Sequence, residues 1–356
     1  MLQASFIKYQ LNFSFGAGTS RGVLHQKDSF FIKISDKDNP LHFGLGEAAP
    51  LSGLSLDAKP NYEAFLNQQL KIYFQNLSAL DNDFWQAIPP EESALRFALE
   101  TAWLDFQHGG KRLIFDTNFA KGQEKIPING LIWMGDKAFM IKQIAQKLEQ
   151  GFTCLKMKVG AIDFAEECSI LKHIRQQFNK QNLTLRVDAN GAWATAEALE
   201  RLQALEQFDL HSIEQPIAPQ QWEHMSLLCE KSPVPIALDE ELMYAPTTPQ
   251  KKILLEQVKP NFIVLKPTLH GGVAGSQAWI ELAQELQVPW WITSALESNV
   301  GLNAICQLAS HLGASGFQGL GTGQLYTNNL ASPLQVNSGF IQSLPQESWN
   351  LESLTF

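Results

Sequence analysis

Residues 152–178 read FTCLKMKVG-AI-DFAEECSILKHIRQQF, and this stretch decides the fold. Its first part is a short, largely apolar run ending in glycine, which indicates a buried strand. Its second part places apolar residues at helical spacing. The same strand–helix order occurs seven times between residues 126 and 313, in units of about 25 to 30 residues. Repeated units with near-continuous apolar strands are typical of a parallel (β/α) barrel.

The segments that flank these units differ from them. GFQGLGTG (316–323) reads as an eighth strand too rich in glycine to lead into an ordinary helix. The first third has three β-like runs followed by two helical patterns, which predicts a small α+β unit. We therefore predict an α/β protein with an N-terminal α+β domain (1–125), a barrel (126–322) and a C-terminal segment (323–356) that packs back on the first domain.

Composition limits the class of protein. The chain has 356 residues, 45% of them hydrophobic, which is enough for a large core. A formal net charge of -9 disfavours binding to nucleic acid or to anionic membranes. The four cysteines are scattered, and neither a signal peptide nor an apolar run long enough to span a bilayer is evident. We expect a cytoplasmic protein with reduced thiols, and the sequence leaves its oligomeric state open.

Charged residues gather at the predicted strand ends. In parallel barrels the catalytic and binding side chains lie at the carboxyl ends of the strands, and these ends surround one opening of the barrel. Two lysines that are two residues apart on a strand point the same way. The charged strand ends are, in chain order, Lys156, Lys158, Asp188, Glu214, Asp239 and Lys266.

The three carboxylates among these ends predict a metal site. Asp188, Glu214 and Asp239 would lie side by side, and they cannot all stay ionised without a counter-charge. A divalent cation that prefers oxygen ligands, most simply Mg²⁺ with Mn²⁺ as a substitute, supplies that charge. Its remaining coordination positions would be open to water or to a substrate oxygen.

The lysines on both sides of this cluster predict proton abstraction next to a carboxylate. A metal that binds the substrate carboxylate stabilises the enediolate charge as it develops. Lys156 is a like charge near Lys158 and would favour a neutral amine there, as a general base requires. Lys266 would face the opposite side of a small carboxylate substrate.

Five separated motifs carry a family resemblance. LKMKVG (155–160), VDANGAW (187–193), SIEQPI (212–217), ALDEEL (237–242) and VLKPTLHGG (264–272) resemble the muconate-lactonizing subgroup of the enolase superfamily. The resemblance extends over nearly the whole chain. It implies an α+β capping domain on a modified (β/α)₇β barrel of the TIM type, which fits the weak eighth unit.

Three further stretches indicate one family within this subgroup. GTSRGVLHQKDSFFIKI (18–34), INGLIWMG (128–135) and TSALESNVGLNAICQLA (293–309) are most similar to the o-succinylbenzoate synthase family. That family dehydrates a cyclohexadiene dicarboxylate in menaquinone biosynthesis. The resemblance implies Lys158 as the base, Lys156 as a contact to the substrate carboxylate, and Lys266 as a cation against the opposite face.

The same resemblance implies several substrate contacts. Ser20 and Arg21 would belong to a loop that closes over the substrate, and Ser294 would line the pocket for the succinyl tail. Asn190 is a further candidate, although it also fits an ordinary turn residue. Arg21 likewise fits an exposed surface charge.

Two other functions remain open at this stage. A racemase of N-acylamino acids or a dipeptide epimerase would use Lys158 and Lys266 as a two-base pair around the same metal site. A non-catalytic binding protein would also account for a barrel, but it gives no reason for lysines on both sides of the carboxylates. Neither nucleic acid nor a membrane is an expected partner.

Overall fold

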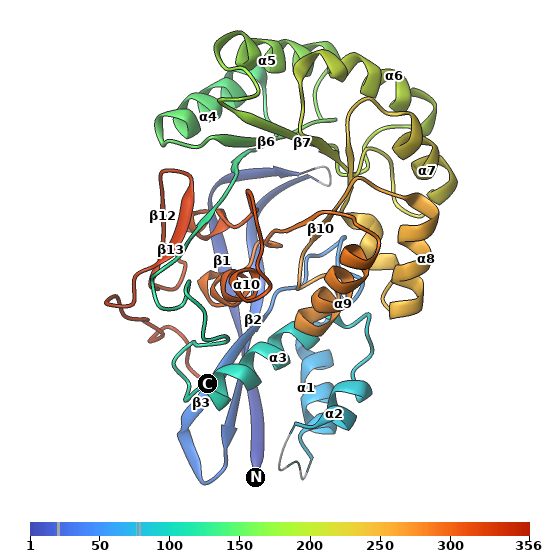
Figure 1. Ribbon diagram of the computed structural model, residues 1–356. Coiled ribbons are helices and arrows are strands. Elements are labelled where there is room, and N and C mark those ends of the chain that lie inside the picture. Colours follow the sequence, from blue (N-terminus) through green and yellow to red (C-terminus); the bar gives the residue numbers. More distant parts are fainter. Residues whose placement is uncertain (20–21, 76, 78–79) are drawn as a thin grey trace.

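The N-terminal part of the molecule is an antiparallel sheet covered by helices (Figure 1). The computed structural model describes residues 1–19, 22–75, 77 and 80–356. The sheet has the order β1-β2-β3. Its elements and helices are β1 (Leu2–Thr19), β2 (Gly22–Asp36), β3 (Asn39–Ala48), α1 (Tyr62–Tyr73), α2 (Asn82–Ala87) and α3 (Ser93–Gln107).

Helix α3 lies directly on this sheet because β3 carries glycine at the contact. A Cβ atom on Gly46 would lie 1.9 Å from the carbonyl oxygen of Ala98, and one on Gly44 would lie 1.9 Å from that of Ala102. Any larger residue would push the helix away from the sheet. Helix α3 also contacts the barrel, since Glu100 accepts a 2.5 Å hydrogen bond from the backbone of Val273.

The second part is a parallel barrel in which seven strands are neighbours in sequence order (Figure 1). This confirms the predicted alternation of strands and helices. The strands are β5 (Gly130–Ile132), β6 (Cys154–Lys158), β7 (Thr184–Asp188), β8 (Ser212–Glu214), β9 (Ile236–Leu238), β10 (Phe262–Leu265) and β11 (Trp290–Ile292). The helices are α4 (Lys137–Glu149), α5 (Phe164–Gln177), α6 (Thr195–Leu205), α7 (Trp222–Lys231), α8 (Thr248–Val258), α9 (Gly272–Glu285) and α10 (Asn299–His311).

The glycine-rich eighth segment joins the two edges of this sheet. Gln318 donates its backbone N–H to Pro127 at 2.8 Å, and Gly319 donates to Ile292 at 2.8 Å. A Cβ atom at Gly319 would lie 2.1 Å from Oγ1 of Thr293, so glycine allows the close approach. The predicted (β/α)₇β arrangement is therefore confirmed, with isolated bridges at Gln318 and Gly319 in the place of a regular eighth strand.

One expectation about the strands was wrong. The run IPINGLIW (126–133) is strand-like in the sequence, but the structure divides it. Its first part belongs to β4 (Lys125–Pro127), which leaves the barrel and pairs with β13 (Phe340–Ser343), and β13 pairs with β12 (Leu334–Asn337). Strands β1 and β2 stay paired up to Thr19 and Gly22, on either side of residues 20–21. A register shift between Asn12 and Ala17 interrupts this pairing.

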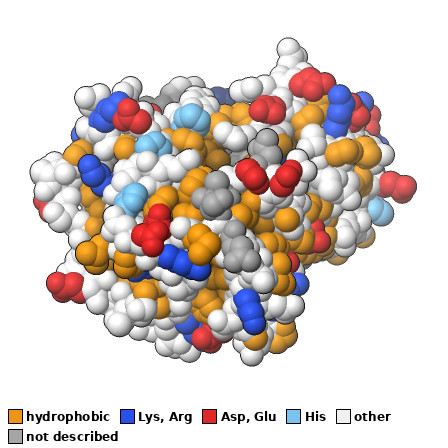
Figure 2. Space-filling view, turned by 90° about the horizontal axis from the view of Figure 1, so that it is seen from below, with side chains coloured by type: hydrophobic (Ala, Val, Ile, Leu, Met, Phe, Trp, Pro, Cys, Tyr) orange, Lys and Arg blue, Asp and Glu red, His pale blue; other side chains and the backbone are white. Residues whose placement is uncertain are grey.

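The C-terminal segment contacts the capping sheet. Leu330 is buried in one cluster with Phe31 and Leu45, and Trp349 and Leu351 pack against that cluster. The domain boundaries drawn from the sequence stay a prediction. Among the described residues, no helix is both long and apolar enough to cross a bilayer. On the face shown in Figure 2, basic and acidic side chains are interspersed, so the described part of that face offers no continuous basic surface.

Candidate active site

The strand register brings the charged strand ends together. Lys158 on β6 lies beside Asp188 on β7, and Asp188 lies beside Glu214 on β8. As the two-residue spacing predicts, Lys156 and Lys158 point the same way: their Nζ atoms lie 2.8 and 2.6 Å from Oδ2 of Asp188. The parallel arrangement thus places both ammonium groups and the carboxylates on one side of the sheet.

Three carboxylates form the centre of this cluster. Asp188, Glu214 and Asp239 are fully buried, and one oxygen atom from each lies within 4.8 Å of the others. Lys156 donates to Glu214, and Lys266 donates to Asp239 from the other side. Three buried anions therefore lie between lysines that come from β6 and from the end of β10.

The charges in the cluster shift one another's pKa. Burial opposes the charge on Lys156, but Asp188, Glu214 and Asp239 outweigh it and raise the pKa of this ammonium group. Burial likewise opposes ionisation of Asp188, yet Lys156, Lys158 and Lys266 hold its pKa below the usual range. Burial and the neighbouring carboxylates raise the pKa of Glu214 to about 7 despite Lys156. A further positive charge beside Glu214 would keep it ionised.

Two carboxylate oxygens in the cluster have no donor in the part of the chain that the structure describes. Oε1 of Glu214 and Oδ1 of Asp239 are buried and have no hydrogen-bond partner among the described residues. An unsatisfied buried anionic oxygen is costly unless a cation or a donor faces it. Three carboxylates that include oxygens without a hydrogen-bond donor fit a hard divalent cation.

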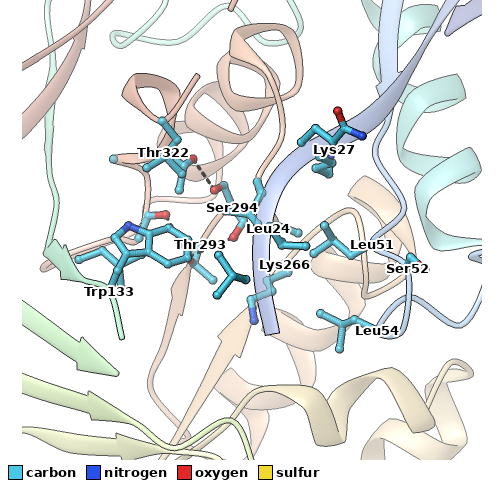
Figure 3. A pocket seen from close by; sticks show the side chains of 18 of the residues that line it. Leu24, Lys27, Leu51, Ser52, Leu54, Trp133, Lys266, Thr293, Ser294 and Thr322 are labelled. Atoms are coloured by element: carbon cyan, nitrogen blue, oxygen red, sulfur yellow. Dashed lines mark hydrogen bonds between the residues drawn. The ribbon is translucent and has the colours of Figure 1, made fainter. Parts of the chain in front are cut away.

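A pocket of about 1170 Å³ opens over this cluster, between the barrel mouth and the β1–β2 hairpin (Figure 3). Its apolar wall includes Leu24 and Leu51 from the cap and Trp133 from the end of β5. Asn190 and Ser294 line it together with the three lysines. The pocket can therefore hold a ligand with an apolar body and a negatively charged end.

Comparison with known proteins identifies the family. Residues 140–347 match the family "Enolase C-terminal domain-like". The o-succinylbenzoate synthase of Desulfotalea psychrophila is 44% identical, over 96% of this chain and 98% of that protein. The crystal structure of MenC from the same organism has a TM-score of 0.84 and 40% identity, over 96% of this chain and 99% of that one. This chain belongs to the o-succinylbenzoate synthase family of the enolase superfamily.

Two more distant relatives differ from each other in activity: one is a synthase and the other an epimerase. The structure of o-succinylbenzoate synthase from Thermosynechococcus elongatus, with magnesium in its active site, has a TM-score of 0.72 and 26% identity, over 89% of this chain and 92% of that one. The L-Ala-D/L-Glu epimerase of Francisella tularensis subsp. novicida is 28% identical over 61% of this chain and 60% of that protein. In the enolase superfamily, a buried acidic triad such as Asp188, Glu214 and Asp239 is typical of a divalent metal site.

Asn190 and Glu240 form a polar link beside Lys158. Asn190, with a left-handed φ of 45°, accepts a 2.6 Å hydrogen bond from Lys158 and donates to Glu240 at 2.8 Å. On a regular strand Glu240 would point away from Asp239, and it is not among the expected metal ligands. The strand is not regular there: β9 ends at Leu238, and the backbone turns at Asp239, so Glu240 lines the pocket without joining the acidic triad. The acidic run DEE after such a short strand was the available signal.

The remaining predicted contacts fall into two groups. Ser294 is buried, lines the pocket, and shares a 2.5 Å hydrogen bond with Thr322. Ser20 and Arg21 lie outside the described residues. His270, which follows β10, accepts a 3.0 Å hydrogen bond from the backbone of Lys266. Burial, Lys266 and Lys251 hold the pKa of His270 well below its usual range, so it stays neutral and supports this turn.

Proposed function

We propose that the protein is an o-succinylbenzoate synthase that dehydrates 2-succinyl-6-hydroxy-2,4-cyclohexadiene-1-carboxylate in menaquinone biosynthesis. The observation that carries this proposal is a buried carboxylate triad with lysines on both sides, in a chain 44% identical to such an enzyme over 96% of its length. The substrate is a small dicarboxylate, and we expect the reaction to take place in the cytoplasm.

Asp188, Glu214 and Asp239 would hold Mg²⁺, as the magnesium in the Thermosynechococcus relative suggests. When bound, the ion supplies positive charge beside the substrate carboxylate, where negative charge develops. Lys156 would add a second positive charge there. Its Nζ lies 2.8 Å from Asp188 and is hydrogen-bonded to Glu214, so the ammonium group would contact that carboxylate beside the triad.

Lys158 would perform both proton transfers. As a free amine it takes the proton from the ring carbon next to the carboxylate, and the C–H electron pair moves into the ring system. The resulting ammonium group then gives this proton to the departing hydroxyl. The C–O bond breaks, water leaves, and the ring becomes aromatic. Asn190 orients Lys158 through their 2.6 Å hydrogen bond.

Lys266 would act from the opposite face as a cation. Its pKa is raised, since Asp239 and Glu240 outweigh the effect of burial, and its Nζ is hydrogen-bonded to Asp239. A fixed ammonium group stabilises a ring that carries extra negative charge through Coulomb and cation–π attraction. Dehydration needs nothing more from this side.

One assay tests the proposed function. The purified protein, mixed with the cyclohexadiene substrate and Mg²⁺, should form o-succinylbenzoate, which is measured by the appearance of the aromatic ring in ultraviolet absorbance. Robust racemisation of N-succinylamino acids without any aromatic product would replace the lyase with the racemase or epimerase alternative. That alternative is favoured only by the shared pair of lysines and by the more distant epimerase relative.

Substitution of Lys266 distinguishes the two reactions. Lys266→Arg keeps a cation that does not readily deprotonate, so dehydration should fall only about 10- to 100-fold, whereas Lys266→Met should lose about 10³-fold. Two-base racemisation should vanish in both variants. The measurements are turnover of the diene and deuterium exchange of N-succinylamino acids in heavy water. Equal loss in the two variants would assign a proton transfer to Lys266.

A further inference from the structure

Strand β2 of the cap carries a lysine that is buried in the wall of the pocket. Lys27 is 7% exposed and lines the same pocket as Lys266, Ser294 and Thr322 (Figure 3). Among the described residues that line this pocket, Lys27 is the buried basic residue that does not belong to the lysines around the acidic triad. The other basic residues that line it there are more exposed, namely Lys8, Lys59, Lys142 and Lys147.

The hydrogen bonds of Lys27 are incomplete. An ammonium group has three N–H donors. Nζ of Lys27 donates to the hydroxyl of Ser29 at 3.3 Å, and within the described residues it forms no ion pair. Two donors on a buried charge are therefore left for a ligand, because a buried ammonium group without an acceptor is costly.

The carboxylates near Lys27 are already engaged by other donors. Glu47 accepts hydrogen bonds of 2.5 to 2.9 Å from the Ser29 hydroxyl, from the backbone and hydroxyl of Ser298, and from the backbone of Gly301. Glu297 accepts from Thr268 and from the backbone of Ala295. Burial lowers the pKa of Lys27, although Glu47 and Glu297 oppose this. Among the described residues, the printed hydrogen bonds of these two carboxylates leave the remaining N–H groups of Lys27 for a ligand that carries acceptor oxygens.

We propose that Lys27 binds the carboxylate at the end of the substrate's succinyl tail, an inference that rests on the proposed function. The substrate has two carboxylates, and the ring carboxylate occupies the end of the pocket at Lys156 and the acidic triad. The tail carboxylate must then lie elsewhere in the same pocket. Lys27 offers it two charge-assisted hydrogen bonds, which are stronger than neutral ones. The Ser294–Thr322 hydroxyl pair lines the same pocket and offers further polar contacts.

This assignment makes Lys27 a determinant of specificity. The apolar side chains of Leu24, Leu51 and Trp133 suit the methylene groups of the tail. A site built to bind a buried charge discriminates against analogues that lack it, because the site's own charge then stays unpaired. The enzyme should therefore prefer a carboxylate over a neutral amide at the end of the tail.

Binding of the stable product tests the proposal without turnover. o-Succinylbenzoate and its tail amide are titrated by calorimetry into the Mg²⁺-loaded wild type, Lys27→Met and Lys33→Met. Lys33 lies on the same strand, where its Nζ contacts the ring of Phe43 outside the pocket. The wild type and Lys33→Met should bind the acid about 10- to 100-fold more tightly than the amide. In Lys27→Met the affinity for the acid should fall by that factor, and the affinity for the amide should change little.

Two outcomes of these titrations would overturn the proposed role of Lys27. Equal affinities of the wild type for the acid and the amide would overturn the assignment, and this comparison needs no variant to fold. Discrimination by Lys27→Met as strong as that of the wild type would also overturn it. Lys27→Arg should restore most of the preference for the acid. A wild type that neither binds o-succinylbenzoate nor forms it from the diene would instead contradict the proposed function itself.

Discussion

Lys158→Ala is expected to abolish dehydration, with a loss of about 10⁴-fold or more in kcat. General acid–base catalysis by a positioned side chain contributes about 10²- to 10⁴-fold, and here one group would serve both as the base and as the acid. The Nζ of Lys158 lies 2.6 Å from both Asp188 and Asn190, at the edge of the metal cluster. The substitution removes the proton carrier while the three carboxylates remain.

The measurement is steady-state formation of o-succinylbenzoate, together with deuterium exchange at the ring carbon in heavy water. Lys172→Ala, on the exposed side of α5 in the same strand–helix unit, is the matched control and should behave like the wild type. Product binding by Lys158→Ala should stay within about 10-fold of wild type, which shows that the site is intact. If this variant retained deuterium exchange or turnover, another residue would be the base.

The barrel could be predicted from the sequence because its signal is local and repeated. Each strand is a short apolar run and each helix has its own periodicity, so seven units can be recognised one at a time. The register of parallel strands then aligns their carboxyl ends, which is why Lys158, Asp188 and Glu214 could be expected together. Long-range pairing carries no such signal. The pairing of β4 with β13 joins segments some 200 residues apart, so the split of the run 126–133 was not foreseen.

The site was predictable where strands are regular and not where the backbone departs from them. Alternation along β6 correctly placed Lys156 and Lys158 on one side. The same rule failed at Glu240, because β9 ends two residues earlier and the chain turns at Asp239. Lys27 was not anticipated for a different reason. Its role depends on how the cap lies over the barrel, and nothing in the run QKDSFF distinguishes a buried lysine in a pocket from one on an exposed edge.

Removal of the metal is expected to stop the reaction and leave the protein folded. In excess chelator, turnover should fall by about 10⁴-fold or more, since the charge that develops on the substrate loses its main counter-charge. Mg²⁺ or Mn²⁺ should restore it. The melting temperature should fall, because a cation that binds only the folded state stabilises it, but the protein should stay folded since Lys156, Lys158 and Lys266 face the carboxylates within hydrogen-bond distance.

Glu214→Gln tests the metal centre by a readout independent of turnover. The variant keeps the size of the side chain but removes one of the three ligand charges, so Mn²⁺ affinity should fall about 100-fold or more, measured by electron paramagnetic resonance. Glu256→Gln, an exposed residue on α8, is the control and should bind Mn²⁺ like the wild type. The amide can still accept the hydrogen bond from Lys156, so the barrel should remain folded. Full turnover in excess chelator, or unchanged Mn²⁺ affinity in Glu214→Gln, would show that these carboxylates serve only as counter-charges to the lysines.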